Sequence, residues 1–297
     1  MLFDPLEQRP VIDRHLHKTI NHLSAFSFIN IFAWQDFFRF DLRLIQDALC
    51  VFAHSPIGCF LYLPPLGDHI SSETFEECFS IMEDINGGRG IGRIENIDTK
   101  RYSLFPNQEF RLVPKEYEYL YYKKDIISLK GNRYKSKRSS YNQFVRNTQV
   151  DYRPYEPGMA SECVRLYRDW ADSRRKTYTN DVYCQMLFEN EKVHGRLLKY
   201  YASLGLVGRV VRVGGVIKGY TLGYPVSENV FCVLAEIADL NLAGIAVYMF
   251  REFCRDADLG QYQFINVMDG FCMDNIRQTK LSFHPTVLMR SYVAVKV

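Results

Sequence analysis

One order of predicted elements occurs twice along the 297-residue chain, and this repeat constrains the fold more than any other feature. Hydrophobic patterning predicts a strand, a helix and a strand in each copy: residues 59–64, 73–85 and 92–98 in the first, and 230–237, 244–257 and 263–269 in the second. Phe60 and Ile94 are 34 positions apart, and so are Phe231 and Ile265. The matched spacing favours a duplicated α/β unit.

The segments around the two copies predict the rest of the architecture. Antiparallel strands are expected before each copy, with a tight turn at Gly214-Gly215 in the second set. Further helices are expected at 158–173, at about 181–204 and at 274–283, and residues 285–297 close the chain as a strand. We therefore expect an α/β (α+β) protein with mixed, mostly antiparallel sheets flanked by helices. The predicted halves are residues 1–147 and 148–297.

Composition excludes several classes of protein. The 37 basic and 34 acidic residues leave a net charge of +3, so global charge does not indicate nucleic-acid binding. The chain has no apolar run long enough to span a membrane and no secretion signal, so we expect a cytoplasmic protein. Its eight cysteines form no C-x-x-C pair, which favours reduced, buried thiols over disulfides or a metal site.

The turn before the second predicted helix has the pattern N-x-x-G-x-A, at Asn241, Gly244 and Ala246. Small residues at the start of a helix let an anion approach unpaired backbone N–H groups, so we predict that these three residues bind the donor. The pattern resembles the pyrophosphate loop of the GNAT acyltransferases, with Asn241 where Gln or Arg is usual. Small residues at this position can also serve only to pack the helix on the sheet.

A basic segment lies between the predicted halves. From Lys123 to Arg146 it holds eight basic residues and a single acid, Asp125. Such a cluster attracts phosphate, an acidic lipid head group or RNA, and aromatic residues interleave with the charges. A solvated basic helix face is the alternative interpretation. The residues that we expect to contact an anion here are Lys135, Lys137, Arg138 and Asn142.

Several short patterns occur together in an informative order. The segment with Ile127, Leu129 and Gly131 is followed by K-R-x-x-x-N-x-F at Lys137–Phe144. Further along come Y-x-x-W at Tyr167–Trp170, N-x-x-D-G at Asn266–Gly270, and R-x-x-K-x-S-x-x-P at Arg277–Pro285. In this order, over about residues 20 to 295, the chain resembles bacterial proteins related to the C-terminal catalytic domain of phosphatidylglycerol lysyltransferase.

That resemblance implies a tandem of two GNAT-type folds, similar also to the Fem-type peptidyltransferases, which take amino acids from aminoacyl-tRNA. We predict an anion or substrate role for Asn266, Arg277 and Lys280. Arg277 and Lys280 are three residues apart on one predicted helix, so they share a face and can clamp a phosphate or carboxylate. The membrane domain of the lysyltransferases has no counterpart in this sequence, so the resemblance does not name the acceptor.

Acyl transfer needs a base that accepts a proton from the acceptor. Glu236 and Asp239 end the strand before the N-x-x-G-x-A turn, and Asp269 ends the neighbouring predicted strand. We predict these three carboxylates as catalytic residues, with helix capping or a surface ion pair as the alternative for each. The histidines lack nucleophile or metal-ligand spacing, and no nucleophile elbow, P-loop or zinc-peptidase motif occurs.

Together these observations predict an acyl- or aminoacyltransferase. The expected co-substrate is acyl-CoA or aminoacyl-tRNA, with no tightly bound cofactor and no metal. The expected acceptor is an amine on a small molecule, peptide or lipid, and tRNA is an expected partner. The alternative from another class is a non-catalytic module that uses the same fold and a basic cleft to bind RNA or an acidic ligand.

Overall fold

A computed structural model describes residues 5–17, 21–271 and 273–297 of the chain. The chain divides into two compact units. Unit 1 comprises Met1–Glu118, Asp269–Met273 and Leu288–Val297, and unit 2 comprises Tyr119–Met268 and Asp274–Val287. The predicted division at residue 147 does not coincide with these units, because the basic segment belongs to unit 2 and the last ten residues return to unit 1.

The strands of unit 1 have the order β1-β2-β3-β4-β11. Its elements are α1 (Pro5–His17), α2 (Phe28–Ala33), β1 (Arg39–Ile45), β2 (Ala48–His54), β3 (Cys59–Leu61), α3 (Ser72–Asn86), β4 (Arg93–Ile97), the first part of β5 (Phe110–Tyr122) and most of β11 (Val287–Lys296). Strands β3 and β4 are parallel, whereas β1–β2, β2–β3 and β4–β11 are antiparallel.

The strands of unit 2 have the order β5-β10-β9-β8-β7-β6. Its elements are the end of β5, α4 (Lys123–Ser128), α5 (Lys135–Asn147), β6 (Val150–Pro154), α6 (Ala160–Thr177), α7 (Asp181–Lys199), α8 (Tyr201–Leu204), β7 (Val207–Val213), β8 (Val216–Pro225), β9 (Val230–Ala238), α9 (Ile245–Arg255), β10 (Phe264–Asn266) and α10 (Asp274–Leu281). Strands β9 and β10 are parallel and the other pairs are antiparallel.

The two units have the same order of elements around their parallel strands. Leu61 pairs with Ile94 in β3–β4, and Phe231 pairs with Ile265 in β9–β10, so both copies form as the spacing predicts, with the first register shifted by one residue. In each unit the second parallel strand then pairs antiparallel with a strand from a distant part of the chain, β11 in unit 1 and β5 in unit 2. These two long strands explain why the units are not contiguous in sequence.

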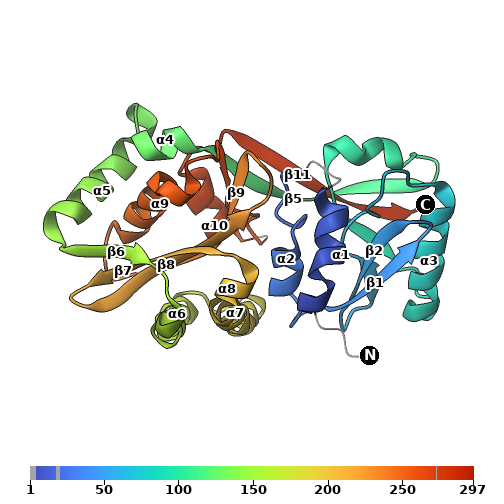
Figure 1. Ribbon diagram of the computed structural model, residues 1–297, viewed down its shortest axis with the longest axis horizontal. Coiled ribbons are helices and arrows are strands. Elements are labelled where there is room, and N and C mark those ends of the chain that lie inside the picture. The colour runs from blue at the N-terminus through green and yellow to red at the C-terminus, as the bar shows by residue number, and fades with distance from the viewer. Residues whose placement is uncertain (1–4, 18–20, 272) are drawn as a thin grey trace. The chain divides into compact units, whose positions relative to one another are not determined.

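Helices cover both faces of the unit 2 sheet. Helices α5 and α9 lie on one face, and α6 and α7 lie on the other (Figure 1). On the α9 face, Phe250 and Phe253 pack in a core with Phe231 of β9. On the α6 face, the Tyr220 hydroxyl lies 2.7 Å from Nδ1 of the half-buried His194, and removal from water lowers the pKa of this histidine to about 3. His194 is therefore neutral at physiological pH.

The cysteines follow the expected pattern within the described part of the chain. Six of the seven described thiols are buried, and Cys184 is half-buried. Cys272 lies outside the described residues. No helix among the described residues is long and apolar enough to cross a membrane.

Candidate functional site

The turn predicted to bind the donor is built around Gly244. This glycine precedes α9 with a φ of 92°, in the left-handed region that favours glycine. A Cβ added there would lie 2.6 Å from the Ser140 carbonyl oxygen and 2.9 Å from Cβ of Phe144. The group that approaches Gly244 closely is therefore the backbone of α5. This geometry favours the packing interpretation of the turn, with Ala246 exposed beside it.

Asp239 and Asn241 form a local network at the end of β9. Asp239 Oδ2 accepts a hydrogen bond from Lys218 Nζ at 2.8 Å, and its Oδ1 accepts from the Asn241 backbone N–H at 2.9 Å and from the Asn241 side-chain amide at 3.0 Å. Burial acts to raise the pKa of Asp239, but the bonds from Lys218 and Asn241 outweigh it and leave the pKa below its ordinary value. Asp239 is thus an ionised turn and ion-pair residue.

A cavity of about 250 Å³ opens where β9 and β10 stop pairing. The two parallel strands pair at three positions, the last being Cys232 with Asn266. Beyond that point Val233 and Glu236 of β9 line the cavity from one side, and Val267 after β10 lines it from the other. We call this space the β9–β10 cavity; its remaining walls come from Tyr121, Leu234, Phe250, Thr279, Lys280 and Phe283. The carboxyl ends of parallel strands are where α/β sheets commonly bind ligands.

Glu236 brings a carboxyl group to the β9–β10 cavity. Its Oε2 accepts a hydrogen bond at 3.3 Å from the Thr221 hydroxyl, which lies directly across on β8. Removal from water raises the pKa of Glu236 to about 8, and the Thr221 hydrogen bond offsets only part of this rise. At neutral pH the group is mostly protonated, and it ionises near the pH at which a free α-amino group loses its proton.

One lysine lines the same cavity, and a second lies against the ring of a residue that lines it. Lys280 of α10 lines it, and its Nζ donates to the Val267 carbonyl oxygen at 2.6 Å. Lys137 of α5 places its Nζ 4.0 Å from the ring centre of Phe283, and burial lowers its pKa. Of the two residues predicted to clamp an anion, only Lys280 lines the cavity, and Arg277 is exposed on α10.

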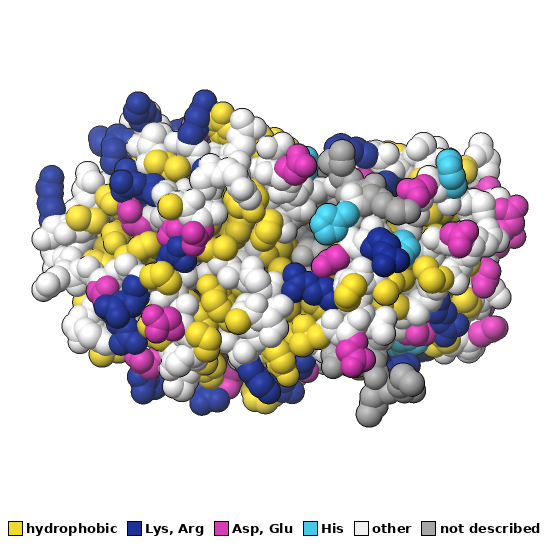
Figure 2. Space-filling view, viewed as in Figure 1, with side chains coloured by type: hydrophobic (Ala, Val, Ile, Leu, Met, Phe, Trp, Pro, Cys, Tyr) yellow, Lys and Arg dark blue, Asp and Glu magenta, His cyan; other side chains and the backbone are white. Residues whose placement is uncertain are grey.

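The other members of the basic segment face elsewhere. Arg138 donates to the carbonyl oxygens of Leu129 and Gly131 and so stabilises the end of α4. Lys135 and Asn142 are exposed. Figure 2 shows Lys and Arg side chains gathered over α4 and α5, and the exposed members of this basic face are Lys124, Lys130, Arg133, Lys135 and Arg146.

The remaining predicted residues form turns. Asn266 is fully buried, and its Oδ1 accepts from the Met268 backbone N–H at 2.7 Å, which supports a left-handed residue at Met268. Asp269 Oδ1 accepts from the Phe271 backbone N–H at 3.0 Å, and this residue belongs to unit 1, whereas Glu236 belongs to unit 2. The N-x-x-D-G pattern therefore encodes two successive side-chain-capped turns.

Sequence reasoning missed most of the cavity wall. Tyr121, Phe250 and Phe283 carried no signal, because aromatic residues at these spacings are typical of any core. Thr221 had a usable signal, since it is the cross-strand partner of Glu236 on a predicted hairpin.

The raised pKa of Glu236 predicts a pH-dependent stability. The folded-state pKa of about 8 exceeds the unfolded value of 4.5, so between these values the unfolded chain has lost the proton that the folded protein still holds. The stabilisation from this proton is complete below about pH 4.5 and is lost as pH rises to about 8. We expect the unfolding free energy of the wild type, relative to Glu236→Gln, to fall by about 1.4 kcal/mol per pH unit in that window. Urea unfolding of both proteins from pH 5 to 8.5 measures this difference; a difference that does not change with pH would refute the raised pKa.

Several solved structures share the fold of this chain. A conserved protein of unknown function from Bacteroides thetaiotaomicron superposes with a TM-score of 0.87 at 22% identity, over 100% of this chain and 99% of that one. L-PGS from Bacillus licheniformis superposes with a TM-score of 0.64 at 15% identity, covering 96% and 91%. FemX superposes with a TM-score of 0.56 at 8% identity, covering 100% and 95%. No curated protein matches the sequence significantly.

The sequence itself defines the family more narrowly. Residues 18–295 match the model of the family described as phosphatidylglycerol lysyltransferase, C-terminal. The chain belongs to this family, in agreement with the motif order between Ile127 and Pro285, and it shares its fold with L-PGS and FemX.

Proposed function

We propose that this protein transfers an aminoacyl group from aminoacyl-tRNA to an amine, with the reacting centre in the β9–β10 cavity of unit 2. The observation that supports this most strongly is Glu236, a carboxyl group with a pKa of about 8 in a largely apolar cavity where two parallel strands diverge. A general base works best when its pKa lies near the working pH.

The residues of the cavity match the steps of aminoacyl transfer. The acceptor nitrogen bonds to the carbonyl carbon of the aminoacyl ester, and the ester bond to the ribose oxygen of the donor breaks. The amine proton passes to ionised Glu236 and then to the departing ribose oxygen. The ammonium of Lys280 brings positive charge to the same cavity, where it would stabilise the oxyanion that develops on the carbonyl.

Two observations favour aminoacyl-tRNA over acyl-CoA as the donor. The backbone of α5 approaches Gly244 at the start of α9, so the Ser140 carbonyl oxygen lies where a CoA pyrophosphate would need to approach. The basic face on α4 and α5 presents five exposed basic side chains to solvent in the same unit as the cavity. Such a face suits the phosphates of an RNA stem.

The basic face gives a test of the donor. We expect Lys135→Ala together with Arg146→Ala to weaken tRNA binding and to flatten its dependence on salt, because each lost phosphate contact removes about 0.7–0.9 from the slope of log K against log [salt]. Fluorescence anisotropy with labelled tRNA at several salt concentrations measures both quantities. The charge-matched control is Lys176→Ala with Lys199→Ala, at exposed positions on α6 and α7.

Equal salt slopes in the two double variants would contradict a role of the basic face in RNA binding. A ligand that binds only the folded protein raises its thermal stability. We therefore expect acetyl-CoA to leave the unfolding temperature of the wild type unchanged. A clear rise in the unfolding temperature with acetyl-CoA would indicate that acyl-CoA, and not aminoacyl-tRNA, is the donor.

A further inference from the structure

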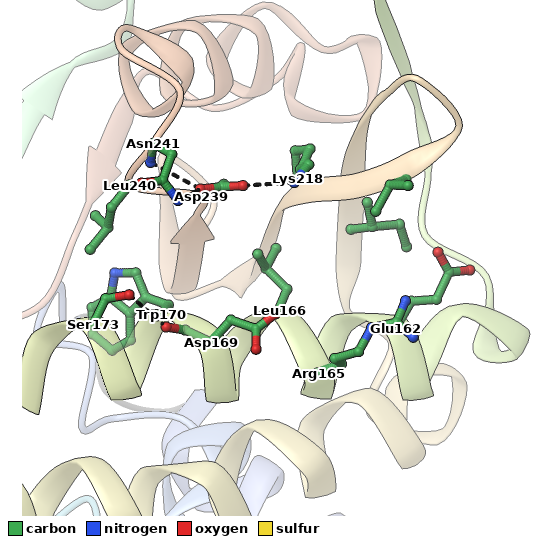
Figure 3. Close-up of a pocket in the computed structure, with 12 residues that line it drawn as sticks. Glu162, Arg165, Leu166, Asp169, Trp170, Ser173, Lys218, Asp239, Leu240 and Asn241 are labelled. Carbon is green, nitrogen blue, oxygen red and sulfur yellow. Dashed lines mark hydrogen bonds and ion pairs between the residues drawn. The ribbon is translucent and has the colours of Figure 1, made fainter.

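A second cavity lies on the other face of the unit 2 sheet, between α6 and the ends of β8 and β9. Its volume is about 290 Å³, and we call it the α6 cavity. Figure 3 shows Asp169 and Trp170 of α6 on one side of it, and the Asp239–Lys218 pair with Leu240 and Asn241 on the other. The transfer reaction proposed above makes no use of this space.

The charged groups of the α6 cavity fall into two kinds. Asp239 is paired with Lys218 at 2.8 Å, and the Glu162 carboxylate is paired with Arg212 at 2.9 Å. Arg165 and Asp169 differ from these. They are four residues apart on α6, a spacing at which opposite charges can pair, yet neither side chain forms an ion pair with the other or with another described residue. Both are exposed and line the cavity.

The opposite signs of these two groups restrict the ligand. A simple anion at Arg165 would meet the repulsion of Asp169, and a simple cation at Asp169 would meet that of Arg165. A molecule that carries both charges satisfies both groups. Apolar surface is also available, because Leu166 and the half-buried Trp170 line the same cavity and Leu240 is 47% exposed beside them.

We propose that the α6 cavity binds a small zwitterion of the amino-acid type. Asp169 holds the ammonium group, Arg165 holds the carboxylate, and an apolar side chain lies against Trp170 and Leu240. The ion pair of Asp239 and Lys218 is held in place by hydrogen bonds and forms a polar wall on the far side of the ligand. This binding is independent of the transfer chemistry, so it can be tested without an activity assay.

Trp170 provides the readout. The chain has two tryptophans, and the other, Trp34, packs in unit 1 against the rings of Phe37 and Phe271, where phenylalanine is a conservative replacement. In a Trp34→Phe background the tryptophan fluorescence reports only on the α6 cavity. The probes are L-leucine, its amide, which lacks the carboxylate, and 4-methylpentanoate, which lacks the amine.

We expect a saturable fluorescence change with L-leucine and at least tenfold weaker binding of both analogues, because each lacks one charge-assisted hydrogen bond. Arg165→Gln and Asp169→Asn should each weaken L-leucine binding at least tenfold. Their controls are Arg168→Gln and Asp172→Asn, which change the same charges on the same helix at positions that do not line the cavity. The absence of saturable binding, equal affinity for the three probes, or equal affinity in the cavity and control variants would overturn the proposal.

Discussion

Glu236→Gln is expected to slow aminoacyl transfer by a factor of about 10²–10⁴, the range that a positioned general base contributes. The amide has nearly the shape of the carboxylic acid but cannot accept the amine proton. Donor affinity should change little, because the basic face lies on other elements. The assay follows single-turnover loss of the aminoacyl ester from charged tRNA, with the primary amine that the wild type uses fastest among free amino acids, short peptides and phosphatidylethanolamine vesicles.

The pH profile sharpens this test. The wild-type rate should rise up to about pH 8 and then level off, because Glu236 becomes a base only when it ionises. The rate of Glu236→Gln should not show this rise with pH. The matched control is Glu228→Gln, an exposed carboxylate on the turn between β8 and β9, which should retain the wild-type rate and profile. A Glu236→Gln rate within a few fold of the wild type would remove Glu236 from the chemistry.

Gly244→Val is expected to lower the free energy of unfolding by about 2–5 kcal/mol. The left-handed backbone costs a side chain about 1–2 kcal/mol, and overpacking against Ser140 and Phe144 costs about 1–3 kcal/mol more. Because the nearest atom is a backbone oxygen, no side-chain movement relieves the clash. Urea unfolding measures the loss.

Gly214→Val separates the two costs. Gly214 has a φ of 58°, and a Cβ there would have no neighbour within 4 Å, so this control should show only the backbone strain. If the Gly244 turn instead binds donor phosphates, Gly244→Val would abolish donor binding while its stability stayed close to that of the control.

The sequence was most informative where local rules decide the structure. The predicted helix at 73–85 forms as α3 at Ser72–Asn86, because Ser71 caps its start and the left-handed Gly87 ends it. The duplicated unit was predictable for the same reason, since spacing and periodicity are local. The pairing of β11 with β4 and of β5 with β10 was not predictable. No local sequence pattern specifies which distant strand pairs with the last strand of each copy.

The candidate site was predictable in part. Glu236 at the end of a strand beside a helix was a sound candidate from position alone. The role of Gly244 could not be predicted from position alone. A glycine that lets a phosphate approach and a glycine that lets a neighbouring helix approach occur in the same sequence pattern. Asp239 shows the same ambiguity, since only its distance from Lys218 reveals the ion pair.

The most direct test of the reacting centre is a crystal structure with an amide-linked aminoacyl adenosine, a donor fragment that the enzyme cannot cleave. We predict the aminoacyl carbonyl in the β9–β10 cavity, between Val267 and β9, with the Glu236 carboxyl on the side of the carbonyl carbon from which an acceptor nitrogen would approach. Binding of the aminoacyl group in the α6 cavity or at the Gly244 turn, with the β9–β10 cavity empty, would contradict the proposed centre.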